Sequence, residues 1–194
     1  MFDKDAFIQF GLHSRILTYG KNVRLASGER SCWYVNWRKI TEDVFLTEQL
    51  LTYVRAYLQD RHITPDCVYG VPESMTKPAI LLQYLLAKDA SNYGKYSHVL
   101  AMGRGAVKKH GMPEDRFFLG VPNKRILVLE DVITTGETLV QHLHRLSPAY
   151  VLVLTDRTQP GRRKKLDAYL QEKNIPLYAL TTFDELKRGA AWKA

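Results

Sequence analysis

The sequence predicts an α/β fold: a mainly parallel twisted sheet flanked by helices, with a small N-terminal hood formed by a helix and a hairpin. From residue 67 onward, short apolar runs alternate with amphipathic segments. The runs 126–129 (ILVL) and 151–154 (VLVL) are continuously apolar, as is typical of parallel strands buried on both faces. Acidic, hydroxyl and glycine residues follow the first run directly. Because parallel sheets bind ligands beyond the carboxyl ends of their strands, we expect the functional site there.

Two N-terminal segments predict the hood. Residues 3–17 have the spacing of an amphipathic helix with Phe7, Phe10 and Ile16 on its inner face. Residues 23–36 are typical of a hairpin that turns at Ser27 and Gly28.

The rest of the chain predicts the sheet and its helices. A long helix is expected to begin after an N-cap at Thr41 and to end near Arg61. The later elements are predicted, in order, as a strand over 67–71, a helix near 78–88, strands over 97–102 and 125–130, a helix over 136–146, a strand over 149–155, a helix near 163–172 and a strand over 176–180.

Composition indicates one globular domain. The chain has 194 residues, of which 45% are hydrophobic and 25% charged, and its formal net charge is +8. We expect a single domain over residues 1–194, with the hood at 1–40 and the α/β core at 41–194. The positive charge favours anionic ligands, but it does not distinguish nucleic acids, acidic lipids and phosphorylated metabolites. Cys32 and Cys67 have no partner at the spacing of a disulfide framework or zinc site.

No segment predicts a membrane span or a secretory signal. The apolar runs are far shorter than the roughly 20 residues that cross a bilayer. The N-terminus reads MFDKDAFIQFG, without the basic start and apolar stretch of a signal peptide. We therefore expect a cytoplasmic location.

The segment after the 126–129 run has the residue types of a phosphate site. Thr134, Thr135 and Thr138 supply hydroxyl donors, and Gly136 permits close approach at the start of a predicted helix. Free N–H groups and the positive end of the helix dipole attract phosphate at such a position. The alternative is that Thr134 or Thr135 is only a helix N-cap.

Glu130 and Asp131 precede these hydroxyls. Two adjacent carboxylates would repel a bare phosphate, so they suit sugar hydroxyls or a metal-bound water. A phosphorylated sugar satisfies both parts of the segment. Alternatively, the two carboxylates are loop residues that face water. The pattern GxxxxGK[ST] of a nucleotide-binding P-loop does not occur.

The segment LVLEDVITTGET closely resembles the phosphoribosyl pyrophosphate (PRPP) binding motif of type I phosphoribosyltransferases. In that family the motif holds ribose 5-phosphate. The resemblance implies that Glu130 and Asp131 face the ribose hydroxyls and that residues 134–138 wrap the 5-phosphate. The residues that it assigns to PRPP are Glu130, Asp131, Val132, Ile133, Thr134, Thr135, Gly136, Glu137 and Thr138.

Further segments are similar to the orotate-specific branch of the family, so that the resemblance covers roughly residues 5–185. Residues 25–28, 34–36 and 38–40 resemble its N-terminal hairpin. RGAVKKHG at 104–111 resembles its mobile catalytic loop, which reaches into the active site of the neighbouring subunit. DRTQPG at 156–161 resembles the segment whose arginine pairs with the orotate carboxylate, and GVPE at 70–73 lies where the family has its pyrophosphate loop.

The resemblance implies roles for the loop cations. Displacing pyrophosphate builds negative charge on the leaving group, which positioned cations stabilise. Arg104, Lys108 and His110, together with Asp131, are therefore expected to be catalytic, and the loop cations with Lys109 to contact PRPP. Mg²⁺ is the expected cofactor, held mainly by PRPP and water, with no direct protein ligand.

Thr134 and Arg157 are expected to bind orotate. The guanidinium of Arg157 suits a flat carboxylate, although the residue could instead be a surface arginine beside a turn. A homodimer that shares its catalytic loops across the interface is expected. Two lysines of the family pattern are replaced, by Ala26 in the hairpin and by Gly105 in the loop.

The resulting function hypothesis is an orotate phosphoribosyltransferase that makes orotidine 5′-phosphate and pyrophosphate from orotate and PRPP, in pyrimidine nucleotide synthesis. A second hypothesis keeps PRPP but changes the acceptor base. A third is a PRPP-sensing regulator or RNA-binding protein of the same fold, favoured by the net charge and the missing lysines. Lys108 and His110 argue against it, because a sensor does not need the loop, and nucleic acid is not an expected partner.

Overall fold

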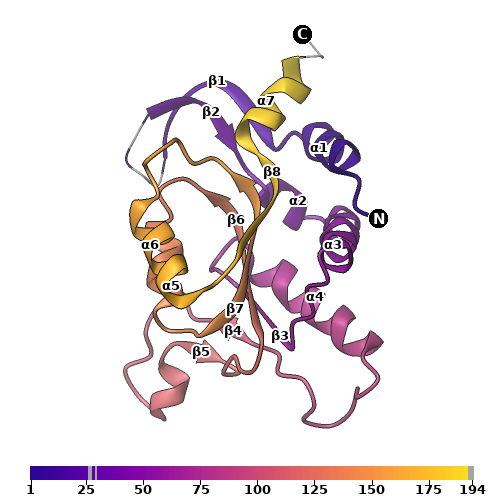
Figure 1. The fold of residues 1–194 in the computed structure, drawn as a ribbon, viewed down its shortest axis with the longest axis vertical. Helices are drawn as coiled ribbons and strands as arrows, with labels where there is room; N and C mark the ends of the chain where they lie inside the picture. The colour runs from indigo at the N-terminus through magenta and orange to yellow at the C-terminus, as the bar shows by residue number, and fades with distance from the viewer. Residues whose placement is uncertain (26–27, 29, 192–194) are drawn as a thin grey trace.

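The fold is built on a parallel sheet, as the sequence predicts. The computed structural model describes residues 1–25, 28 and 30–191 (Figure 1). Its central sheet has four parallel strands in the order β3-β6-β7-β8. These strands are β3 (Cys67–Gly70), β6 (Ile126–Ile133), β7 (Pro148–Asp156) and β8 (Leu177–Thr182).

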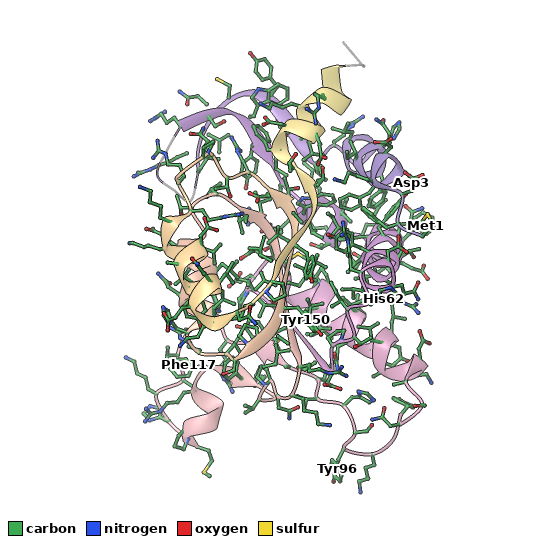
Figure 2. The ribbon with its side chains drawn as sticks, in the orientation of Figure 1. Met1, Asp3, His62, Tyr96, Phe117 and Tyr150 are labelled. Atoms are coloured by element: carbon green, nitrogen blue, oxygen red, sulfur yellow. The ribbon has the colours of Figure 1, made fainter. Side chains whose placement is uncertain are left out.

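Helices cover both faces of this sheet. Side chains alternate across a strand, so Leu127 and Leu129 pack on one face while Ile126 and Val128 pack on the other. The first face is covered by α3 (Val44–Asp60) and α4 (Thr76–Asp89), and the second by α5 (Glu137–Leu143) and α6 (Lys164–Lys173). Burial on both sides is the reason that the strand sequences are continuously apolar, and Figure 2 shows the side chains that fill these layers.

The hood consists of α1 (Lys4–His13), β1 (Leu17–Arg24), β2 (Arg30–Val35) and the short α2 (Arg38–Thr41). Trp37 is fully buried and stacks on Phe7 of α1, with 5.1 Å between ring centroids. Its Nε1 donates to Oγ1 of the buried Thr155 in β7 at 2.9 Å. The hood is therefore tied to the carboxyl end of the sheet, and the antiparallel β1–β2 hairpin lies at that end of the molecule (Figure 1).

Several boundaries in the N-terminal half differ from the prediction. The first helix ends at His13, and the buried Ile16 follows it. The hairpin begins at Leu17 rather than at residue 23, and of its predicted turn Gly28 has φ +84° while Ser27 lies outside the described residues, as does Ala26.

Thr41 is not the N-cap of the long helix. Thr41 ends α2, and the cap of α3 is Asp43, whose Oδ1 accepts from the N–H of Leu46 at 2.8 Å. The predicted end of this helix near Arg61 is confirmed, because α3 ends at Asp60 and Arg61 is its C-cap.

The strand predicted over 97–102 is wrong. The Ser97 hydroxyl and backbone close a turn with Gly94, so only Met102–Gly103 (β4) is extended. This strand pairs with β5 (Phe118–Leu119) in a separate antiparallel ribbon outside the central sheet.

Two helices were not predicted from the sequence: the 3-10 helix η1 (Pro113–Arg116) and the C-terminal α7 (Phe183–Ala191). Helix α7 packs beside α1, and the ion pair between Lys4 and Glu185 joins the two helices. Within the described ranges, no helix is long and apolar enough to span a bilayer.

Candidate active site

The strand β6 extends through Ile133, so Glu130 to Ile133 belong to the strand and the connecting turn is only Thr134, Thr135 and Gly136. Gly136 is the N-cap of α5 with φ +74°, and no side chain caps this helix. The alternative that Thr134 or Thr135 is the N-cap is therefore wrong. A Cβ at Gly136 would lie 2.6 Å from Cδ2 of Leu166 in α6, so both the backbone and the packing require glycine here.

The turn surrounds a hollow of about 140 Å³, which we call the loop hollow. It is lined by Glu130, Val132, Ile133, Thr134, Thr135, Gly136, Glu137, Thr138, Leu139 and Gln141. The structure thus brings together every residue predicted to contact PRPP in this segment except Asp131. Hydroxyl groups around a small hollow can hold a phosphate oxygen by hydrogen bonds.

Glu130 and Asp131 face different surroundings because neighbouring residues of a strand point to opposite faces. Glu130 is 6% exposed, and its Oε1 accepts from the N–H of Asp131 at 3.1 Å. Burial, and next the charge of Asp131, raises the pKa of Glu130 well above its ordinary value. Burial thus disfavours the charged form of Glu130 under the strand end, whereas Asp131 is half-buried in a second hollow.

This second hollow, the central hollow, has a volume of about 320 Å³ and lies between the hairpin and the ends of β6 and β7. It is lined by Arg24, Leu25, Tyr34, Val35, Arg38, Asp131, Val132, Thr134 and Arg157. A third hollow, the arginine hollow, has about 90 Å³ and is lined by Leu25, Arg30, Ser31, Thr134, Thr135, Arg157, Gln159 and Arg162. The three hollows meet at Thr134, which lines all of them.

Arg157 follows the last residue of β7 and is fixed in place from several sides. Its Nη1 donates to the carbonyl of Trp33 at 3.0 Å and its Nη2 to Oγ of Ser31 at 2.7 Å. The guanidinium also lies 4.3 Å from the ring centroid of Phe183. Arg157 is therefore not a surface arginine beside a turn, and it shares the central and arginine hollows with Thr134, its predicted partner in binding the base.

The predicted catalytic loop lies between β4 and η1. The N–H of Arg104 donates to the carbonyl of Phe117 at 2.9 Å, and that of Lys108 to Arg116 at 3.0 Å, so the loop is the end of a long hairpin. Its first residues lie beside the 70–73 segment, where the position of a Cβ on Gly105 is 3.1 Å from Oε1 of Glu73. Phe117 and η1 are at the end of the molecule opposite the β1–β2 hairpin (Figures 1 and 2).

The loop cations are not brought to the strand-end site within one chain. Arg104 and Lys108 are half-buried, Lys109 and His110 are exposed, and all four are absent from the described residues that line the three hollows.

Known proteins are similar to this chain in sequence and in fold. No family model matches the chain. The chain is similar to the orotate phosphoribosyltransferase of Buchnera aphidicola subsp. Acyrthosiphon pisum, with 26% identity over 192 residues that cover 94% of the chain and 86% of the relative. A transcriptional regulator, GfcR of Methanocaldococcus jannaschii, is 26% identical over 132 residues, which are 64% of the chain.

Solved structures agree with the sequence comparison. The orotate phosphoribosyltransferase of Aeropyrum pernix superposes with a TM-score of 0.70 at 20% identity, over 96% of this chain and 99% of that one. The chain has the type I phosphoribosyltransferase fold. Leishmania donovani UMP synthase gives a TM-score of 0.73 at 18% identity, and this chain spans 38% of its length.

Several residues that line the hollows of this phosphoribosyltransferase fold were not predicted from the sequence. Arg30, Arg162, Gln159 and Tyr34 line the hollows, although none of them was expected to bind a substrate. Gln159 and Tyr34 lie within the family-like segments 156–161 and 34–36, and Arg162 lies in a stretch rich in basic residues, 157–165. The tertiary contact between the hairpin and the strand ends brings Arg30 and Tyr34 to the hollows. Among the described residues, no group of three His, Cys, Asp or Glu side chains is placed to hold a metal.

Proposed function

We propose that this protein is an orotate phosphoribosyltransferase, which transfers ribose 5-phosphate from PRPP to orotate and releases pyrophosphate, as a step of pyrimidine nucleotide synthesis. The observation that carries the proposal is one cleft in which Asp131, Thr134 and Arg157 meet. The carboxylate and hydroxyl come from the segment that resembles the PRPP motif, and the arginine from the segment that resembles the orotate site.

The donor sugar would lie along the end of β6. The hydroxyls of Thr134, Thr135 and Thr138 line the loop hollow and would hold the 5-phosphate. Asp131 would accept hydrogen bonds from the ribose hydroxyls in the central hollow. Burial raises the pKa of Glu130 and so disfavours a second negative charge beside the phosphate.

The acceptor base would meet Arg157. Its guanidinium is already oriented by Ser31, Trp33 and Phe183, so little side-chain freedom is lost when it binds a carboxylate. Thr134 lies in the same hollow and supplies a hydroxyl to the ring.

The leaving pyrophosphate requires cations. When the bond from the anomeric carbon breaks, negative charge grows on the leaving oxygen and positive charge on the ribose. We propose that Arg104, Lys108, Lys109 and His110 supply the cations, and that they do so across a homodimer, because within one chain they do not line the hollows.

The oxygen ligands that the central hollow offers suit a Mg²⁺ ion that is bound mainly by the substrate PRPP. Asp131 is the carboxylate that lines the central hollow, and Mg²⁺ prefers oxygen ligands while it keeps several waters. Asp131 would therefore meet the ion or its waters, and PRPP would supply the other oxygens. When bound, the ion neutralises charge on the pyrophosphate. We further propose that the chain acts as one domain, in the cytoplasm.

The absorbance of orotate tests the proposal. The protein is mixed with orotate, PRPP and Mg²⁺, and each component is omitted in turn. We expect a loss of absorbance that needs both PRPP and Mg²⁺. No loss of absorbance in a sample that still binds PRPP would contradict orotate as the acceptor and favour another base or a PRPP-sensing regulator.

A further inference from the structure

Tyr69 lies where three segments of the proposed active site meet. It is 1% exposed in β3 and directly precedes the 70–73 segment. Its Oη lies 3.1 Å from Nδ1 of His142 on α5, the helix that begins at the Gly136 turn. Its ring packs edge-on against Phe118 of β5, with 5.8 Å between the ring centroids. The neighbours of this one side chain therefore come from parts of the chain that are distant in sequence.

The ribbon of β4 and β5, which we call the loop stem, carries the predicted catalytic loop at its end. Each of its strands has only two residues, so few ladder hydrogen bonds hold it together. Gly103 of the stem lies directly against Tyr69. A Cβ at Gly103 would overlap Oη of Tyr69 and would lie 2.7 Å from Cγ of Pro72. Glycine permits this close approach, and the stem is therefore seated on the tyrosine hydroxyl.

Arg145 makes a second contact between α5 and the loop stem. It follows the C-cap of α5, and its guanidinium lies 4.6 Å from the ring centroid of Phe117. The carbonyl of Phe117 accepts from the N–H of Arg104, the first residue of the predicted catalytic loop. Helix α5 has seven residues and is about 10 Å long at 1.5 Å per residue. One short rigid element thus joins the Gly136 turn at its start to the loop stem at its end.

We propose that Tyr69, His142 and Arg145 are positioning residues, which fix the loop stem relative to the turn that would hold the 5-phosphate. We call these three residues the stem bridge. Its effect on turnover rests on the proposed function, in which the loop cations act on the leaving pyrophosphate. The inference goes beyond that function because all three residues lie outside the motifs that resemble the family.

The hydrogen bond within the stem bridge joins two neutral groups near pH 7. Burial raises the pKa of Tyr69 to about 12, so the hydroxyl keeps its proton. Burial, and next the charge of Arg145, lowers the pKa of His142 below its ordinary value. A hydroxyl and a neutral imidazole can each donate or accept, so the bond forms with either tautomer of the ring. Phenylalanine at position 69 removes this bond and keeps the aromatic packing on Phe118.

The test compares Tyr69→Phe with Tyr169→Phe. The hydroxyl of Tyr169 on α6 donates to the carbonyl of Leu143 at 2.9 Å, so each variant loses one hydrogen bond to α5. Tyr69 is the one that contacts Gly103 and Phe118 of the stem. Hydrogen exchange of peptides that cover residues 102–119 measures opening of the stem, and steady-state kinetics give kcat and KM for orotate.

Only the stem bridge is broken when the stem opens locally, whereas global unfolding breaks the hydrogen bonds of both tyrosines. One hydrogen bond corresponds to about a two- to tenfold change in an equilibrium constant. We therefore expect exchange of the stem amides to rise about two- to tenfold in Tyr69→Phe and to stay at the wild-type rate in Tyr169→Phe. The kcat of Tyr69→Phe should fall by a similar factor with KM for orotate unchanged. Both variants should lower the thermal midpoint.

Arg145 is tested by two substitutions that differ in charge. Arg145→Gln removes the cation from the ring of Phe117, and stem exchange should rise about two- to fivefold. Arg145→Lys keeps a cation at this position and should restore most of the wild-type protection. Equal exchange in the two variants would overturn the role given to Arg145.

Other outcomes separate the two proposals. If the wild type turns over orotate but stem exchange or kcat stays unchanged in Tyr69→Phe, this inference is wrong and the proposed function stands. The same holds if Tyr169→Phe changes both quantities equally. If the wild type does not turn over orotate, the proposed function is wrong, and hydrogen exchange still decides the stem bridge. Faster stem exchange in Tyr69→Phe alone then supports the bridge, and unchanged exchange overturns it.

Discussion

Glu130 and Asp131 are neighbours in the chain, yet their environments differ because a strand turns successive side chains to opposite faces. Glu130 is buried beneath the end of β6, whereas Asp131 lines the central hollow. Burial disfavours the charged form of a carboxyl group, so the pKa of Glu130 is raised. The pair therefore combines a buried carboxyl group, whose charged form is disfavoured, with one carboxylate that faces the proposed ribose site.

The raised pKa of Glu130 predicts a pH-dependent stability. Above the unfolded-state pKa of about 4.3, the unfolded chain releases this proton while the folded chain retains it, so stability falls as pH rises toward the folded-state pKa. Glu130→Gln removes this dependence. We expect its thermal midpoint to rise relative to that of the wild type as the pH increases above about 4. Glu48→Gln, an exposed position on α3, is the control, and parallel curves for wild type and Glu130→Gln would contradict the prediction.

Asp131→Asn is expected to weaken PRPP binding. Hydrogen bonds to a charged group contribute about 1.5–3 kcal/mol, so the affinity should fall about ten- to hundredfold. Titration calorimetry with PRPP measures the effect, and Asp5→Asn on the exposed face of α1 is the matched control. Unchanged affinity in Asp131→Asn would count against the ribose role.

At the scale of elements, the turn between β6 and α5 depends on packing by α6. Gly136 needs a positive φ, and Leu166 occupies the place of a Cβ. Gly161 also has a positive φ, of +75°, but the nearest atom to its Cβ position is 3.9 Å away. The two glycines therefore separate backbone strain from steric overlap.

Gly136→Ala should destabilise the fold more than Gly161→Ala. A left-handed conformation costs a non-glycine residue about 1–2 kcal/mol, and only Gly136→Ala adds overlap with Leu166, for which overpacking costs about 1–3 kcal/mol more. Urea unfolding of both variants gives the comparison. Equal losses would show that Leu166 moves aside without cost.

Lys108, in the loop between β4 and η1, is expected to affect turnover. If Lys108 stabilises the leaving pyrophosphate, Lys108→Ala should lower turnover about ten- to hundredfold, while Lys173→Ala, at the end of α6, should not. Steady-state rates at saturating orotate and PRPP measure this. Equal losses in the two variants would rule out the role given to Lys108.

At the scale of the whole molecule, the hood and the sheet share one hydrophobic core. Phe7, Ile16 and Trp37 of the hood belong to the same buried cluster as Leu129 and Leu154 of the sheet. The Trp37 to Thr155 hydrogen bond joins the two parts at the cleft. The position of the hairpin over the site, and with it the arginine hollow, therefore depends on global stability.

Trp37→Phe tests this connection. Phenylalanine keeps an aromatic ring on Phe7 but leaves the buried Thr155 hydroxyl unpaired, which costs about 1–3 kcal/mol. We expect one cooperative unfolding transition at a lower urea midpoint. Trp33→Phe, in the half-buried part of β2, is the control. A separate early transition of the hood would show that the chain is not one cooperative domain.

The sequence alone determined the features that depend on local pattern. Continuous apolar runs predicted the parallel strands β6 and β7, because strands buried on both faces must be apolar throughout. The segment from Glu130 to Thr138 was located as the site because its residue types follow such a strand.

Only the tertiary structure decided which distant residues complete the site. Residues 97–101 are apolar in part but find no partner in the sheet, because the Ser97 turn directs the chain away from it. Arg30 and Arg162 are separated by most of the chain, and no local sequence pattern indicates that they line the same hollow. The hood brings Arg30 to the strand ends through the burial of Trp37, a long-range contact that no short sequence pattern contains.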